Sequence, residues 1–452
     1  MKSRASSSNT ASLVKPSGPT PIERMARPFQ EFSESEAAGG VLLLAATALA
    51  LAWANSPWAE SYSTLWEHKF TMGFDGFALS KSILHWINDG LMAIFFFVVG
   101  LEIKRELLVG ELASPRHAVL PIAGALGGVV VPALLYLSLN AGGPGAAGWG
   151  IPMATDIAFA MGAMALLGSR VPVGLKVFLT ALAIVDDIVA VLVIAIFYTG
   201  NLSWLSLGVA GGFFAALIAA SILGMRHPLP YALLGLCLWV AMLLSGVHAT
   251  IAGVLVALAV PARPRIDVGK FIARGRRFLD QMENPEDGEE HILRSEARQV
   301  AVMALEDACE KVETPLQRFE HTLLPWVRLI IMPIFALANA GVALGTGTAA
   351  ATTSPVSLGI VSGLLVGKPI GIFCASWLAV SLGLASLPAK VGWRQIFGVG
   401  VIGGIGFTMS IFIANLAFAG QPLLEVAKLG IFAASLAAGG TGFLLLSKFG
   451  RA

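Results

Sequence analysis

Hydrophobic residues occur along most of the chain in long continuous runs, separated by short polar stretches. Most runs approach the ~20 residues that a helix needs to cross the hydrocarbon core of a bilayer. The pattern predicts twelve apolar segments: 38–54, 84–108, 118–139, 149–168, 174–198, 203–224, 230–245, 247–261, 322–342, 356–382, 394–416 and 423–446. The two segments joined at Ser245-Gly246 are short, so one kinked span is the alternative there.

The composition agrees with this pattern. Hydrophobic residues make up 56% of the 452 positions and charged residues 13%, against about 25% charged in soluble domains. A net charge of +2 offers no basic surface for nucleic acid, and 3 cysteines cannot form a disulfide framework. A soluble enzyme, a disordered chain and a nucleic-acid-binding protein are therefore excluded, and the fold class predicted is an all-α polytopic membrane protein.

Positive charges test the number of spans. With both termini in the cytoplasm, 25 of the 30 Lys and Arg residues fall on the inner side, 2 (Lys69 and Lys81) lie outside, and 3 lie in or at spans. Such an excess on the cytoplasmic side is typical of inner-membrane proteins. A single kinked span at 230–261 would place all later loops on the wrong side, so twelve spans are preferred.

The termini and two long connections complete the domain organisation. Residues 1–37 form a polar cytoplasmic tail, 38–446 the transmembrane domain and 447–452 a cytoplasmic C-terminus. A cleaved signal peptide ending near Ala50-Leu51-Ala52 is the alternative for the first segment, but that segment begins far from Met1.

The two long connections, 57–81 and 262–321, are predicted to fold differently. Residues 57–81 lie outside and predict a β-hairpin around Asp75-Gly76, whose edge would pair with a second copy; a solvated loop with interface aromatics is the alternative. Residues 262–321 form a cytoplasmic insertion that holds 13 of the 28 acids. Within it, 289–311 has the spacing of a surface helix.

Four charged residues lie well inside apolar segments: Asp156, Asp186, Asp187 and Lys368. A charge at that depth costs at least ~2.5–3.5 kcal/mol on insertion scales, so such residues are functional candidates. A purely structural ion pair, such as Asp186 with Lys368, is the alternative. Three acids cannot all pair with one base, and crowded buried carboxyl groups bind protons readily. The cluster therefore predicts a site that exchanges protons for cations.

Adjacent residues on a helix point ~100° apart, so Asp186 and Asp187 cannot serve one ligand equally. One of them is expected to face the cation and the other a different partner. Small hard cations prefer oxygen ligands, and Thr155 offers a hydroxyl and a carbonyl beside Asp156.

Two segments are poor continuous helices. Pro152 precedes Thr155-Asp156, and four glycines crowd 400–406, although close helix packing also explains glycines. Each segment is the second of a triplet, 118–198 or 356–446, and the triplets begin on opposite sides. The pattern predicts inverted three-helix repeats whose interrupted helices form a midplane binding site.

Other titratable residues have two interpretations. His248, at the start of a span, is either a packing residue or a group that titrates near neutral pH. Glu102, Arg105 and Glu106 end the second span and form either a solvated cap or, with Glu320 and His321, a charge network that responds to pH.

Several motifs in order resemble the NhaA family of bacterial Na⁺/H⁺ antiporters. They are GLEIKREL (100–107), MATDIAFAMG (153–162), AIVDDIVAVLVIA (183–195), SGVHATIAGV (245–254), LANAGV (337–342), GLLVGKPIGI (363–372) and GIGFTMSIFIA (404–414). The resemblance covers most of 38–446, and the family is a known example of inverted repeats.

The resemblance implies a secondary active, electrogenic antiporter of a bacterial inner membrane, not an enzyme, with no cofactor. It would export Na⁺ or Li⁺ in exchange for H⁺ by alternating access, with pH-regulated activity, as a homodimer in the lipid bilayer. Asp187 would be the main cation and proton carrier. Asp186 would pair with Lys368 or share the site as a Na⁺ ligand, Thr155 would be a further Na⁺ ligand, and Thr155-Asp156 would lie at the crossing of the broken helices. Lys368 would compensate charge. Six residues match positions implicated in the pH response: Glu102, Arg105, Glu106, His248, Glu320 and His321.

Two departures affect the pH response. The 262–321 insertion is longer than the family pattern, and Leu324 stands where some members carry a second His. Three other functions remain as alternatives: a proton-coupled transporter of an organic solute, an intramembrane aspartyl protease and a cation channel. The first needs a larger pocket, the second two carboxylates from separate segments, and the third a continuous pore.

Overall fold

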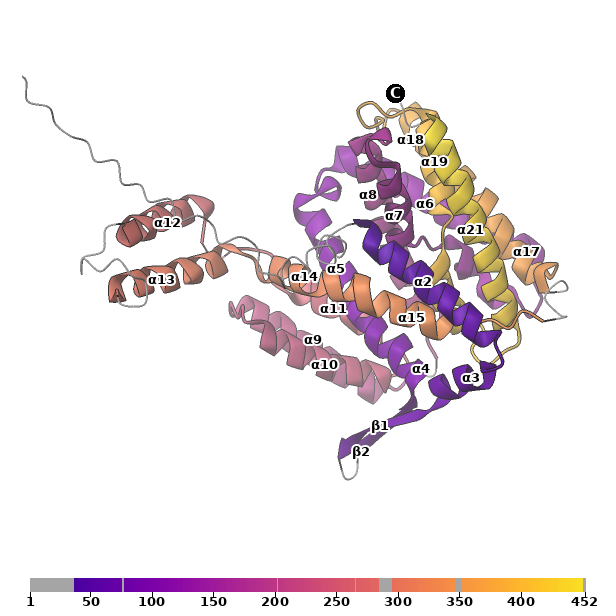
Figure 1. Cartoon of the computed structure of the whole chain (residues 1–452), viewed down its shortest axis with the longest axis horizontal. Coiled ribbons are helices and arrows are strands. Elements are labelled where there is room, and N and C mark those ends of the chain that lie inside the picture. The colour runs from indigo at the N-terminus through magenta and orange to yellow at the C-terminus, as the bar shows by residue number, and fades with distance from the viewer. Residues whose placement is uncertain are drawn as a thin grey trace, which may run out of the picture.

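The computed structural model is nearly all helical, with one small sheet at an end of the bundle (Figure 1). The structure describes residues 36–74, 77–200, 202–264, 266–283, 295–345 and 351–449. The first half contains α2 (Glu36–Ala54), α3 (Ala59–Glu67), β1 (Lys69–Phe74), β2 (Phe77–Ser82), α4 (Ile83–His85), η1 (Trp86–Leu91), α5 (Met92–Val109), η2 (Glu111–Ala113), α6 (Pro115–Asn140), η3 (Ala146–Met153), α7 (Ile157–Leu167), η4 (Gly168–Arg170) and α8 (Val173–Phe197).

The second half continues with helices of similar apolar character. They are α9 (Trp204–Ile222), α10 (Pro228–Leu243), α11 (Ile251–Ala259), α12 (Val268–Glu283), α13 (Glu296–Val312), α14 (Pro315–Trp326), η5 (Val327–Ile331), α15 (Met332–Asn339), α17 (Pro355–Ser362), η6 (Gly363–Gly367), α18 (Lys368–Ser381), α19 (Trp393–Gly403), α20 (Phe407–Ala417) and α21 (Leu423–Phe449). Three π-helical turns, η1, η5 and η6, lie within longer helical segments.

Each of the twelve predicted apolar segments contains helix. In the described part of the chain, 8 helices are long and apolar enough to cross a membrane, or up to 10 if each of two bent pairs is one span. The short segments are α10, with 16 residues, and α11, with 9. They are separate helices, and the turn between them includes Gly246 at φ +84°. The polytopic all-α class is confirmed.

The connection at 57–81 folds as a short helix followed by the predicted hairpin. The chain turns by 113° between α2 and α3, and β1 then pairs antiparallel with β2, with Lys69 opposite Ser82. Tyr62 anchors α3 because its hydroxyl donates to Leu337 O at 2.8 Å. The hairpin projects from the bundle (Figure 1). The alternative of a solvated loop is wrong, and the sequence analysis did not predict α3.

The insertion at 262–321 forms two helices that pack against each other and project from the bundle (Figure 1). The second, α13, corresponds to the predicted surface helix, although residues 284–294 of this region lie outside the described residues. The first, α12, was not predicted. Ser295 caps α13 by accepting a hydrogen bond from Arg298 N at 3.2 Å.

Two helices are interrupted where the sequence predicts it. Extended residues 154–156 separate η3 from α7, and α19 meets α20 at a bend of 46°. Gly404 is required at the second break because a Cβ there would lie 2.4 Å from Leu364 O. Each interrupted helix is the second of its triplet, between α6 and α8 and between α17–α18 and α21. The triplets pack together mainly through α6 against α18.

The apolar interior consists of two clusters. The larger joins both triplets with α2 and α15, and it surrounds the interrupted helices. The smaller joins α9, α10 and α11 with one side of α5. The four charged residues predicted inside apolar segments lie within the larger cluster, at the crossing of the two breaks: Asp156, Asp186, Asp187 and Lys368.

Candidate functional site

Asp156 holds the two breaks together. Its Oδ1 accepts the Phe159 N–H of α7 at 3.1 Å, and its Oδ2 accepts the Thr408 N–H of α20 at 3.0 Å. The Thr408 hydroxyl also donates to Oδ2, and Asp156 N donates to Ile405 O at 2.7 Å. A helix N-terminus carries partial positive charge, so one carboxylate stabilises the N-termini of both second half-helices.

The opposite ends of the broken helices meet groups of the opposite sign. Lys368 Nζ donates to the carbonyl of Met153, the last residue of η3. Thr155 Oγ1 lies 3.1 Å from the carbonyl of Gly403, the last residue of α19. Helix C-termini carry partial negative charge, which an ammonium group or a hydroxyl proton offsets. The crossing therefore presents four helix ends, each with a polar partner.

One carboxylate oxygen of Asp186 has two polar partners. Its Oδ2 lies 2.6 Å from Lys368 Nζ and 2.7 Å from Thr155 Oγ1, and all three side chains are buried. The expected pairing of Asp186 with Lys368 is therefore present. The Thr155 hydroxyl has one proton, which Asp186 and the Gly403 carbonyl both face. That proton is donated to one or shared between them.

Asp187 differs from its neighbour. Its Oδ2 is buried without a hydrogen-bond partner among the described residues, and so is Asp186 Oδ1. A buried acceptor without a partner is costly, and a proton or a cation would satisfy it.

The available oxygens suit a small hard cation as cargo. Asp187 Oδ2, Asp186 Oδ1 and the Thr155 hydroxyl are oxygen ligands of the kind such ions prefer. In the described part of the chain, no group of three or more His, Cys, Asp or Glu side chains could hold a metal.

The residues of the expected pH response fall into two places. Arg105 donates to Glu320 and lies 3.8 Å from Glu106, whose Oε2 accepts Glu111 N at 3.0 Å. Glu102 is half-buried on the same helix, α5, about one turn before Glu106. His321, next to Glu320 on α14, is exposed.

His248 lies apart from that group. Its Nε2 is 3.9 Å from Asp89 Oδ1, its Nδ1 is 3.1 Å from the Thr250 hydroxyl, and its ring meets that of Phe412 edge to face. His85 Nε2 lies 2.8 Å from the other oxygen of Asp89. Asp89 was not among the predicted site residues, although a charge near the start of the apolar segment 84–108 could have identified it as a candidate.

Thr408 is the other site residue that the sequence analysis missed. It supplies two of the hydrogen bonds to Asp156. Its position directly after the glycines of 400–406 was the available signal, because that position is the first turn of a second half-helix.

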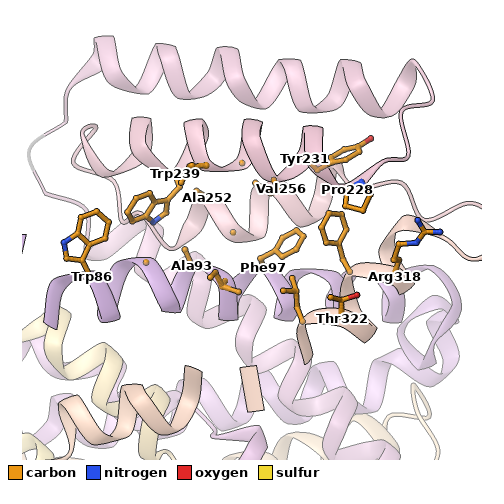
Figure 2. A pocket seen from close by; sticks show the side chains of 18 residues that line it. Trp86, Ala93, Phe97, Pro228, Tyr231, Trp239, Ala252, Val256, Arg318 and Thr322 are labelled. Atoms are coloured by element: carbon orange, nitrogen blue, oxygen red, sulfur yellow. The ribbon is translucent and has the colours of Figure 1, made fainter. Parts of the chain in front are cut away.

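A large apolar cavity lies away from the acids. It has a volume of about 670 Å³, and apolar and aromatic side chains line most of it. In Figure 2 Trp86 and Trp239 lie at one end and Arg318 at the other. Its lining contains none of Asp156, Asp186, Asp187 or Lys368, so the buried charges do not serve this cavity.

The family described as "Na+/H+ antiporter 1" matches residues 30–446. The chain is 54% identical over 428 residues to the Na⁺/H⁺ antiporter NhaA of Oleidesulfovibrio alaskensis, covering 95% of each chain. It is 52% identical over 432 residues to the Na⁺/H⁺ antiporter NhaA 2 of Syntrophotalea carbinolica (95% of this chain, 98% of that one). It is also 51% identical over 426 residues to NhaA of Koribacter versatilis (94% and 92%).

Proposed function

The chain belongs to the NhaA family of Na⁺/H⁺ antiporters, and we propose that it exports Na⁺ or Li⁺ in exchange for protons, with Asp187 as the group that carries either ion. The observation that carries this proposal is the buried oxygen of Asp187 without a partner, beside an Asp186–Lys368 pair that is already formed. Such an oxygen is free to bind a proton or a cation in turn.

Competition for one site gives the exchange. When Asp187 holds a proton it cannot ligate Na⁺, and when it ligates Na⁺ the proton has left. Asp186 and Thr155 supply further oxygens, and Lys368 keeps the net charge of the cluster low. Alternating access then requires that this occluded site open to one side at a time.

We also propose a membrane topology, an oligomeric state and a regulation for the protein. The excess of basic residues on one side supports the proposal that both termini lie in the cytoplasm and that the protein lies in a bacterial inner membrane. The β-hairpin is the proposed contact of a homodimer because its edges are available for pairing. Exchange is proposed to be electrogenic and pH-regulated, with Glu102, Arg105, Glu106 and Glu320 as residues of the pH response.

The proposal is tested with purified protein in liposomes that contain a pH dye. Addition of Na⁺ or Li⁺ outside is expected to make the interior alkaline, because inward cation movement drives protons out. Asp187→Asn is expected to abolish the signal, since a neutral amide neither binds a proton near neutral pH nor neutralises Na⁺.

Asp280→Asn in α12 is the matched control and should behave as the unaltered protein. A Na⁺-driven signal of normal size in folded Asp187→Asn protein would remove Asp187 as the carrier. A protein that gives no response to any alkali cation between pH 6 and 9 would refute the exchange itself.

A further inference from the structure

One face of α20 connects the ion site with the end of the bundle that carries the hairpin. Thr408, Phe412 and Asn415 are spaced i, i+4 and i+7, so they share this face. Thr408 bonds Asp156, while Asn415 donates to Asn339 Oδ1 at 2.7 Å. At ~1.5 Å per residue, Phe412 lies about 6 Å and Asn415 about 10 Å beyond Thr408 along the axis.

Three amide side chains meet at the far end of this face, and we name them the outer amide cluster: Asn88, Asn339 and Asn415. Asn339 Nδ2 donates to Asn88 Oδ1 at 2.8 Å, and Asn88 Nδ2 donates to Asn339 Oδ1 at 3.3 Å. They come from η1, α15 and α20, and Asn88 and Asn415 are only half-buried. A polar cluster of this kind provides hydrogen-bonding partners for a hydrated ion.

The outer amide cluster lies on the hairpin side of the bundle. Asn339 ends α15, directly after the Leu337 and Ala338 carbonyls that face the Tyr62 hydroxyl of α3. Asn88 follows Trp86, whose Nε1 donates to Phe70 O in β1 at 3.1 Å. Since the hairpin is the proposed outer connection, the cluster faces the outside.

Phe412 separates this cluster from the ion site. Its ring is fully buried, with centroids 5.6 Å from Phe96, 5.6 Å from His248 and 6.3 Å from Phe335. Those rings come from α5, the turn before α11 and α15, so the ring of Phe412 is enclosed by three elements. A closely packed layer of buried rings between two polar groups blocks the passage of water and ions.

We propose that Phe412 is the outer gate of the transport route: it seals the Asp156–Asp187 site from the outer amide cluster, through which the cation and the proton reach the outside. This inference rests on the proposed exchange, because a gate matters only if ions cross the site. Displacement of this one ring, by a tilt of α20 relative to α5 and α15, joins the Thr408 end of the face to the amides.

Thiol accessibility tests the seal without any transport measurement. The background is the full chain with Cys237, Cys309 and Cys374 changed to Ser, in right-side-out vesicles and with a membrane-impermeant thiol reagent outside. Asn415→Cys is expected to react readily and Thr408→Cys slowly. Adding Phe412→Ala to Thr408→Cys is expected to raise its labelling rate at least tenfold.

Phe418→Ala is the matched control, because Phe418 is as buried as Phe412 but ends the helix beside Gly148. It should leave the labelling of Thr408→Cys unchanged. Equal labelling of Thr408→Cys with and without Phe412 would overturn the gate, and so would an unreactive Asn415→Cys. If Phe412→Ala fails to fold, Phe412→Leu, which keeps part of the apolar bulk, is expected to give an intermediate rate; an unchanged rate in it would equally overturn the proposal.

Leakage of protons gives the second measurement. In liposomes with an imposed pH gradient and no Na⁺ or Li⁺, Phe412→Ala is expected to dissipate the gradient several times faster than the unaltered protein or Phe418→Ala. A Phe412→Ala protein that leaks no more protons than the unaltered protein, and that still exchanges Na⁺ for protons normally, would refute the gate while leaving the exchange intact. A failure of the unaltered protein to exchange would refute the proposed function, and the labelling results would still decide the seal.

Discussion

At the scale of single residues, two adjacent acids have different environments. Asp186 is fixed by Lys368 and Thr155, whereas Asp187 keeps a buried oxygen without a partner in the described structure. The difference follows from the helix, which points neighbouring side chains ~100° apart. One oxygen of Asp186 is therefore committed to Lys368 and Thr155, and we propose Asp187 as the group that carries the transported ions.

The Asp186–Lys368 pair predicts an effect on stability. Lys368→Ala leaves the Asp186 carboxylate and the Met153 carbonyl buried without their partner, and removal of one member of a buried pair costs about 3–5 kcal/mol. We expect a clearly lower apparent melting temperature in detergent, measured by intrinsic fluorescence. The double variant Lys368→Ala/Asp186→Asn should recover much of the loss, because no uncompensated charge remains. An unchanged melting temperature in the single variant would show that the pair contributes no stability.

The charged residues of the site could be predicted from the sequence. Asp156, Asp186, Asp187 and Lys368 stand out because few charges occur in long apolar segments, and the structure brings them together at one crossing. Thr408 and the outer amide cluster did not stand out. Neutral polar side chains are far less costly in a membrane than charges, so their presence in a span gives a weaker signal.

At the scale of elements, the fold depends on close backbone contacts that glycine permits. A Cβ on Gly127 of α6 would lie 2.1 Å from Gly371 O of α18, and a Cβ on Gly371 would lie 2.1 Å from Gly127 O. These two helices are the first members of the two triplets. The contact therefore sets the distance at which the interrupted helices cross.

We expect Gly127→Val to prevent this contact, because the new side chain meets backbone that cannot rotate away. The folded fraction, judged by a single sharp peak in size-exclusion chromatography, should fall severalfold. Gly208→Val in α9 is the control, since no atom lies within 4 Å of a Cβ built there. Equal yields of the two variants would mean that the α6–α18 crossing tolerates a wider separation than the structure has.

Elements were predictable where hydrophobic runs or glycine breaks define them. The two interruptions and the β-hairpin are examples, because Pro152, the 400–406 glycines and Asp75-Gly76 mark them directly. The short helices α3 and α12 were missed. Each is a surface helix whose few apolar positions are interleaved with polar ones, so no long run identifies it.

At the scale of the whole molecule, the helices form two separate apolar clusters. The two triplets enclose the buried charges, while α9, α10 and α11 form a separate apolar cluster against α5. The hairpin and the α12–α13 pair project from the bundle (Figure 1). Helix α5 joins the two clusters, because its Phe96 contacts Phe412 in the larger one while its Ala93 and Leu101 belong to the smaller one.

The hairpin predicts the oligomeric state. Ile83 N donates to His68 O at 2.9 Å, so the two ends of the hairpin meet, and a short Gly-Ser linker can replace residues 69–82. We expect this deletion to halve the protein mass measured by light scattering in detergent, since it removes the proposed dimer contact. Exchange in liposomes should remain, because Asp156, Asp187 and Lys368 lie far from the deletion in sequence. A deleted protein that still has the mass of two chains would place the dimer contact elsewhere.

Competition between Na⁺ and H⁺ for Asp187 is measured by proton release. Na⁺ or Li⁺ is added to purified protein in weakly buffered detergent solution at a pH where Asp187 is protonated, and the pH change is recorded. We expect a saturable release of protons that choline chloride does not cause and that Asp187→Asn abolishes. Saturable Na⁺ binding without proton release, or an undiminished release from Asp187→Asn, would contradict it.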